Sequence, residues 1–212
     1  MHYNYIAIEG NIGAGKTTLA KMLAEQFNGK LILEEFKNNP FLEKFYKDPA
    51  KYSFPLELSF LAERYQQMIK ELSSMELFYN LTISDYFLNK SLIFARKTLG
   101  DDEYQLFRTL FNIMDANVPK PDLLVHLYVK VENLQANIKR RGRSFEQNIP
   151  DEYLHSIQES YFQYLNQQTK MRILIIDINK LDFVKNPKDF QYIIDAINQE
   201  HPVGITRLYL PP

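Results

Sequence analysis

The segment from Gly10 to Thr17 constrains the fold of this chain more than any other. It reads Gly-Asn-Ile-Gly-Ala-Gly-Lys-Thr, which satisfies the phosphate-loop pattern G-x-x-x-x-G-K-[S/T] at every fixed position. Residues 5–8 before it predict a short buried strand, and apolar residues recur every three to four positions over 19–27, as on one face of a helix. A strand, a glycine-rich loop and a helix in this order predict a binding site for a nucleoside triphosphate.

The glycines of this loop give the backbone the freedom to wrap closely around an anion. Peptide NH groups of the loop and of the helix start then point at the phosphates. We expect Lys16 to reach the outer phosphates and Thr17 to bind a Mg²⁺ ion. The residues predicted to bind the triphosphate are Gly10, Asn11, Ile12, Gly13, Ala14, Gly15, Lys16, Thr17 and Thr18.

Composition narrows the class of protein. The 212 residues suffice for one α/β domain, and no linker rich in Pro, Gly or Ser divides residues 1–212. The lack of cysteine excludes disulfides and thiolate metal sites, and the N-terminus has no signal-like leader, so we expect a cytoplasmic protein. No apolar run approaches the roughly 18 residues of a membrane span. A net charge of −1 favours a small-molecule substrate over nucleic acid.

Four more segments have the apolar, β-branched composition of strands and, with the first, make five. They are residues 30–34, 81–85, 123–129 and 173–177. Helical patterns separate them at about 55–72, 101–113, 131–141, 151–168 and 187–199. This alternation predicts a parallel sheet covered by helices on both faces, with ligands at the carboxyl ends of the strands. Glu34 and Asp85 fall at that edge, beside the phosphate loop.

A GTPase is one alternative, because residues 179–182 read Asn-Lys-Leu-Asp and match the guanine-reading pattern N-K-x-D. A GTPase also needs a D-x-x-G motif to sense the γ-phosphate. No Asp in the sequence is followed three residues later by Gly. The isolated motif therefore does not support a GTPase.

A different combination of motifs decides between the classes of phosphate-loop enzyme. Glu34 follows the second strand, Asp85 follows the third, and the basic stretch 139–143 precedes Glu146. Together they resemble the deoxynucleoside kinase family, most of all its bacterial deoxyadenosine and deoxyguanosine kinases, over almost the whole chain. The resemblance implies a P-loop kinase fold with a five-stranded parallel sheet of order 2-3-1-4-5, an arginine-rich lid and a homodimer. It also implies transfer of the γ-phosphate of ATP to the 5′-hydroxyl of a deoxynucleoside.

The resemblance assigns the catalytic roles. Glu34 matches the general base, and this match alone favours it over the adjacent Glu35. Asp85 matches the acid of a D/E-R-S motif that helps to hold Mg²⁺. Arg141 and Arg143 match lid arginines that stabilise the transferring phosphate together with Lys16.

The sequence departs from the family pattern at three positions near these residues. Tyr86 and Phe87 replace the Arg and Ser of the D/E-R-S motif, so a positive charge is missing there and we expect Arg141 and Arg143 to supply more of it. Another lid arginine of the family falls on Asn137, which leaves the packing of the ATP adenine open.

Other positions match the family's acceptor pocket. Tyr46 and Glu146 match the pair that binds the deoxyribose 3′-hydroxyl, and Phe94 is the candidate for stacking on the base. Tyr46 and Phe94 are equally compatible with ordinary core packing.

Position 57 bears on the choice of base. Glu57 stands where the family usually has Gln, and Arg64 lies seven residues later on the same helix face. Because the Asp that pairs with this arginine in the family falls on Ser91, we expect Glu57 to balance Arg64. A carboxylate only accepts hydrogen bonds, which suits the two adjacent donors of guanine better than adenine. Arg64 or a water molecule could supply the donor that adenine needs, so deoxyadenosine and deoxyguanosine both stay open as substrates.

These observations predict a magnesium-dependent kinase of purine deoxynucleosides in nucleotide salvage. A nucleoside monophosphate kinase is the nearest alternative, but it needs more basic residues near the acceptor than Arg64 alone. A nucleotide-binding module without catalysis is the other alternative. The candidate base, metal carboxylate and lid argue against it.

Overall fold

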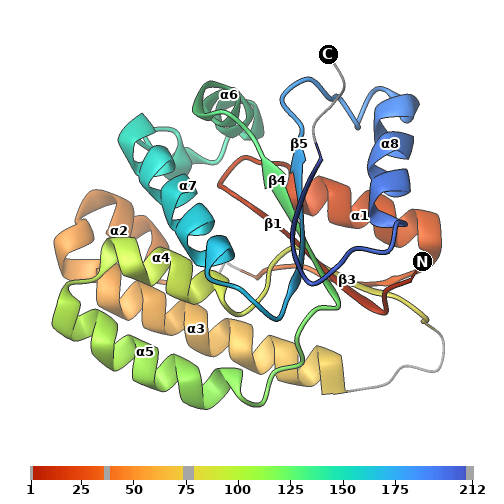
Figure 1. The fold of residues 1–212 in the computed structure, drawn as a ribbon. Helices are drawn as coiled ribbons and strands as arrows, with labels where there is room; N and C mark the ends of the chain where they lie inside the picture. Colours follow the sequence, from red (N-terminus) through yellow and green to blue (C-terminus); the bar gives the residue numbers. More distant parts are fainter. Residues whose placement is uncertain (1, 36–38, 74–78, 209–212) are drawn as a thin grey trace.

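A computed structural model of the protein describes residues 2–35, 39–73 and 79–208. Its centre is one parallel sheet in the order β2-β3-β1-β4-β5-β6 (Figure 1). The strands are β1 (Tyr5–Gly10), β2 (Lys30–Ile32), β3 (Thr82–Ser84), β4 (Leu123–Tyr128), β5 (Arg172–Asp177) and β6 (Gly204–Leu208). The five predicted strands and their order are confirmed, with ends that differ by up to two residues.

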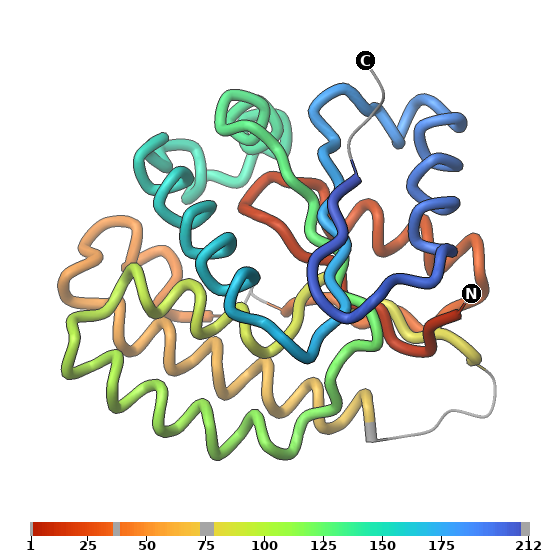
Figure 2. Tube along the Cα trace, in the orientation of Figure 1, coloured from red at the N-terminus to blue at the C-terminus, as the bar shows by residue number. Residues whose placement is uncertain are grey.

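The prediction of five strands is wrong by one. β6 pairs in parallel with β5, Gly204 beside Arg172, and Figure 2 shows this last segment running along β5. It is an edge strand whose residues are half-buried or exposed, so its sequence lacks the apolar run that marks the inner strands.

Helices cover both faces of the sheet (Figure 1). They are α1 (Lys16–Phe27), α2 (Leu42–Lys47), α3 (Pro49–Ser73), α4 (Lys90–Thr98), α5 (Asp101–Asp115), α6 (Val131–Arg141), α7 (Asp151–Asn166) and α8 (Pro187–Ile197). The patterns at 55–72, 101–113, 131–141, 151–168 and 187–199 correspond to α3 and α5–α8. The sequence analysis did not identify α2 or α4, and it placed the start of α3 at 55. The helix starts at Pro49 and contains Pro55 in its second turn.

The alternation of side chains in β1 divides the core into two layers. Ile6 and Ile8 belong to a cluster with α1, α6 and α8, whereas Tyr5 and Ala7 face a second cluster with α4 and α7. A third cluster fills the space between α3, α4 and α5, around Phe107. Within the described residues, no helix is both long and apolar enough to span a membrane.

Gly13 lies where the phosphate loop passes closest to α6. Its φ is +83°, and a Cβ atom on it would lie 2.9 Å from the carbonyl oxygen of Leu134. Gly142 at the end of α6 has a similar φ of +73°, but a Cβ there would meet no atom within 4 Å. Substitution of Gly142 therefore tests backbone strain alone, whereas substitution of Gly13 adds a steric contact.

We predict that Gly13→Ala lowers the free energy of unfolding by about 3 kcal/mol, from strain plus overpacking. Gly142→Ala is the control and should lose about 1 kcal/mol, from strain alone. Urea unfolding followed by circular dichroism measures both values. Equal losses would show that α6 moves away from the loop at no cost.

Candidate active site

The phosphate loop joins β1 to α1, and the side chain of its lysine, Lys16, bends back toward the backbone of the loop. Lys16 Nζ donates to the carbonyl oxygens of Gly10 and Asn11, both at 2.9 Å. Burial, together with the nearby charge of Lys90, lowers the pKa of Lys16 to about 8. The side-chain amide of Asn11 donates to the carbonyl oxygen of Leu154 and so ties the loop to α7.

The buried carboxyl group of Glu9 holds the start of the phosphate loop. Glu9, the fifth residue of β1, is fully buried and accepts the peptide NH of Gly10, the peptide NH of Phe87 and the hydroxyl of Tyr161. Burial raises the pKa of Glu9. The sequence analysis did not single out this residue, which fixes the loop relative to β3 and α7.

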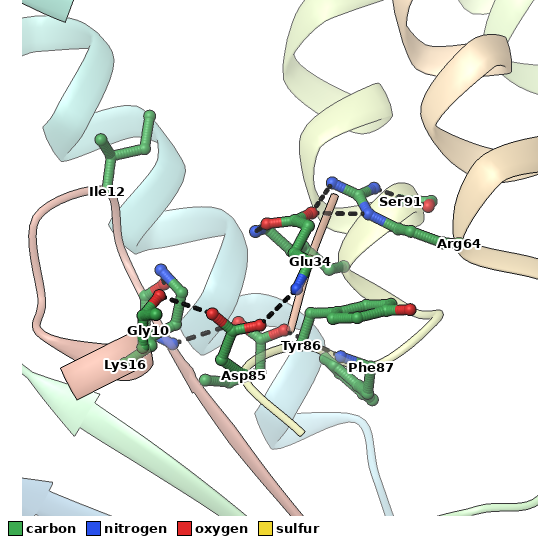
Figure 3. Close-up of polar contacts among 12 residues, drawn as sticks. Gly10, Ile12, Lys16, Glu34, Arg64, Asp85, Tyr86, Phe87 and Ser91 are labelled. Atoms are coloured by element: carbon green, nitrogen blue, oxygen red, sulfur yellow. Dashed lines mark hydrogen bonds and ion pairs between the residues drawn. The ribbon is translucent and has the colours of Figure 1, made fainter. Parts of the chain in front are cut away.

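Asp85 connects the loop to the end of β2. Its Oδ2 accepts the hydroxyl of Thr17 at 2.5 Å, and its Oδ1 accepts the peptide NH of Glu34 at 2.7 Å (Figure 3). Asp85 is 4% exposed and forms no ion pair with any residue that the structure describes. A buried carboxylate that forms no ion pair among the described residues and lies beside a threonine hydroxyl fits Mg²⁺, which prefers few protein oxygens and several waters.

The carboxylate of Glu34 is held by two cations. Its Oε1 accepts Nε and Nη2 of Arg64 at 2.9 and 2.7 Å, and its Oε2 accepts Nζ of Lys90 at 2.5 Å. Burial alone would raise the pKa of Glu34, but the charges of Lys90 and Arg64 outweigh it and hold the pKa well below its usual range. Glu34 lines the same cavity as Lys16, whereas Glu35 is exposed outside it.

Arg64 does not pair with Glu57, so this expectation was wrong. The guanidinium binds Glu34 and donates through Nη1 to the hydroxyl of Ser91 at 2.7 Å (Figure 3). It also lies over the ring of Phe60, 4.8 Å from the ring centre. The small Ser91 leaves Arg64 without a carboxylate on α4, and Glu34 takes that place. Glu57 accepts the hydroxyl of Thr98 at 2.9 Å instead.

The acceptor cavity extends from Glu34 toward α2, α3 and α4. Glu57 is 3% exposed on its wall, and burial raises the pKa of Glu57 to about 7 against the opposing charge of Arg64. Phe94 also lines the cavity, with its ring edge-on to Tyr161 and its face near Lys90.

The lid arginines and the candidate sugar-binding residues meet at the mouth of this cavity. Arg141 and Arg143 both form ion pairs with Glu146, the latter at 3.1 Å. The ring of Tyr46 stacks on Phe145 at 6.1 Å. Glu146 therefore pairs with both arginines for which the sequence analysis expects a role at the phosphate.

A second cavity lies on the other side of the phosphate loop, between α6 and residues 178–184. Asn137 on α6 donates to the carbonyl oxygen of Gly13 at 2.9 Å. The N-K-x-D residue Asn179 uses its side-chain oxygen for the peptide NH of Lys130, so here it serves the structure of the loop. The sequence analysis missed Phe183, which lines this cavity against Gly15.

Comparisons with known proteins identify the family of this chain. The model of one family, described as deoxynucleoside kinase, matches residues 6–201. The chain belongs to the deoxynucleoside kinase family.

Relatives within this family match nearly the whole chain. The chain is 35% identical to a deoxyguanosine kinase of Bacillus subtilis, covering 92% of this chain and 96% of the relative. It is 34% identical to a deoxyadenosine kinase of Dictyostelium discoideum, covering 91% and 78%. A solved structure of deoxyadenosine kinase from M. mycoides with bound dATP aligns with a TM-score of 0.79 at 25% identity, covering 92% of this chain and 100% of that chain.

Tyr86 and Phe87, which the sequence analysis matched to the family's Arg and Ser, do not line the acceptor cavity. Tyr86 is fully buried, and its hydroxyl donates to Gln67 on α3 at 2.5 Å. Phe87 packs in the core cluster that contains Tyr5 and Ala7 of β1.

Lys90 lines the acceptor cavity and is a site residue that the sequence analysis missed. Its signal was a lysine at the start of an apolar helix, next to Ser91.

We predict that Asp85→Asn raises the Mg²⁺ concentration needed for tight triphosphate binding by at least about tenfold, because the amide has no charge for the ion. Isothermal titration with ATP at several Mg²⁺ concentrations measures this. Asp195→Asn, an exposed change on α8, is the control. An unchanged Mg²⁺ dependence would exclude Asp85 as a ligand.

Proposed function

We propose that this protein transfers the γ-phosphate of ATP to the 5′-hydroxyl of a purine deoxynucleoside and prefers deoxyguanosine. One observation carries the proposal. An ionised carboxylate, Glu34, lies in the same cavity as the phosphate-loop lysine and is linked through its peptide NH to the candidate metal residue Asp85.

The proposed reaction is a single displacement at the γ-phosphorus, with ADP as the leaving group. The 5′-oxygen attacks the γ-phosphorus, the bond from this phosphorus to the bridging oxygen of ADP breaks, and the hydroxyl proton passes to Glu34. Phosphoryl transfer needs mainly in-line placement and positive charge, which Lys16, Arg141 and Arg143 supply after the lid closes. Because the pKa of Glu34 is low, the proton moves late, when the attacking oxygen has become acidic by bonding to phosphorus.

The proposal includes Mg²⁺ held by Thr17 and Asp85 with the phosphates. When bound, the ion would neutralise charge on the triphosphate. A homodimer and a cytoplasmic location belong to the proposal as well. Family membership supports the homodimer, and the supply of ATP and deoxynucleosides supports the location.

The base preference rests on Glu57. Ionised, this carboxylate offers only acceptors, which match the N1–H and 2-amino donors of guanine. Protonated, it offers one donor and one acceptor, which match the edge of adenine. The name of the Bacillus subtilis relative agrees with the guanine assignment. Tyr46 and Glu146 are proposed to hold the 3′-hydroxyl once Glu146 releases the lid arginines.

We predict that Glu34→Gln lowers turnover with Mg²⁺-ATP and the best deoxynucleoside by about 10²- to 10⁴-fold, because the amide cannot take the proton. The assay follows ADP formation with the four deoxynucleosides, two ribonucleosides and the monophosphates. Glu35→Gln, next in the chain but exposed, should keep full activity. Turnover only with monophosphates would identify a nucleoside monophosphate kinase, and near-normal activity of Glu34→Gln would remove Glu34 as the base.

We predict that the ratio of kcat/KM for deoxyguanosine to that for deoxyadenosine rises between pH 6 and pH 8, as Glu57 loses its proton near pH 7. The charged and titratable groups that act on Glu57 are Arg64, Lys90, Glu34, Tyr46 and Tyr153. The pKa values of Arg64, Tyr46 and Tyr153 are raised and that of Glu34 is lowered, so these four stay outside this range. The ratio cancels effects common to both substrates, such as titration of ATP.

Two variants test this pH dependence. Glu57→Gln should give a ratio that is lower and flat with pH, because an amide always has one donor and one acceptor. Glu63→Gln, on the same helix but outside the acceptor cavity, should behave like the wild type. A sloping ratio in Glu57→Gln would assign the pH dependence to another group.

A further inference from the structure

Lys90 is a cation in an unusual place. It is 7% exposed at the first position of α4, with Nζ 2.5 Å from Glu34 Oε2 and 5.6 Å from the centre of the Phe94 ring. Lysine is rarely buried to this extent without a partner. Its carboxylate partner is the residue proposed above as the general base.

Stability does not explain this lysine. A positive charge at the start of a helix opposes the helix dipole. The desolvation of a buried ion pair offsets most of its Coulomb attraction, so an apolar side chain of the same size would serve the core as well. We therefore looked for a role of Lys90 in the cavity that it lines together with Lys16.

The hydrogen bonds of Glu34 show where an acceptor hydroxyl can bind. A carboxylate has about four lone-pair positions, two on each oxygen. Arg64 uses both positions of Oε1 through its Nε and Nη2. On Oε2, Lys90 uses one position, and no other side chain of the described residues donates a hydrogen bond to this oxygen. The open position therefore lies on Oε2, and a hydroxyl bound there shares one oxygen atom with the ammonium of Lys90.

We propose that Lys90 positions Glu34 and supplies positive charge to the transferring phosphoryl group, the charge that position 86 lacks in this chain. This inference rests on the proposed function. As the 5′-oxygen bonds to phosphorus and ADP leaves, the hydroxyl proton passes to Oε2 and Glu34 becomes neutral. Lys90 keeps its protons throughout. The new phosphate ester then replaces Glu34 as the anion beside Lys90, so the positive charge is balanced before and after transfer.

Lys90→Met and Lys90→Arg test this role, with Lys97→Met as the matched control, because Lys97 is exposed on the same helix. We would measure the single-turnover rate of phosphate transfer, the KM for the deoxynucleoside and the affinity for Mg²⁺-ATP. Lys90→Met should lower the transfer rate about a hundredfold, with KM and ATP affinity changed less than about threefold. Lys90→Arg should recover at least about tenfold of this loss, and Lys97→Met should match the wild type.

Other outcomes would overturn the role of Lys90. A transfer rate in Lys90→Met within threefold of an active wild type would overturn it and leave the proposed function intact. Equal losses in KM, ATP affinity and rate, without rescue by arginine, would identify a purely structural residue. A wild type that transfers no phosphate would overturn the proposed function and this role together. If Lys90→Met does not fold, Lys90→Gln removes the charge but keeps a donor, and the same criteria apply.

Discussion

The carboxylate of Asp85 joins three elements on which the candidate site depends. It follows β3, which lies between β2 and β1 in the sheet. One of its oxygens accepts the Thr17 hydroxyl from the start of α1, and the other accepts the peptide NH of Glu34 after β2. The strand order therefore places Asp85, the candidate metal ligand, between the phosphate loop and the candidate base. In a sheet of another order, the same residues would not meet.

Local patterns in the sequence predicted the parts of the structure that local physics determines. The phosphate loop, the inner strands and the position of Glu34 at a strand end follow from glycine placement and apolar runs. The half-exposed β6 and the short α2 carry no such pattern, so they were missed.

The errors in the site concern contacts between distant parts of the chain. Arg64 has two acidic residues within reach, one on its own helix and one 30 positions earlier. Helical spacing favoured Glu57, but the fold brings Glu34 to the guanidinium at 2.7 Å. Lys90 was missed for the same reason, because nothing near it in the sequence shows that a carboxylate will lie against it. Such pairs become visible only when the strand order is known.

The cations of the candidate site all bind acceptors of the protein itself. Lys16 binds carbonyl oxygens of its loop, Arg141 and Arg143 bind Glu146, and Lys90 binds Glu34. Lys90 and Glu146 are buried, and these contacts give their charges partners. In the proposed reaction the ligands would exchange these contacts for their own, and this exchange would reduce the net free energy of binding.

The hydrogen bond from Asn137 to the carbonyl oxygen of Gly13 links the donor site to the lid. Asn137 lies one helical turn before Arg141, and the backbone of α6 packs against Gly13. In the proposed kinase, a nucleotide that shifts the phosphate loop would also shift the helix that carries Arg141, because Gly13 and Asn137 join the two. Binding of the phosphate donor and of the acceptor would then be thermodynamically coupled, and by reciprocity each substrate would change the affinity for the other by the same factor.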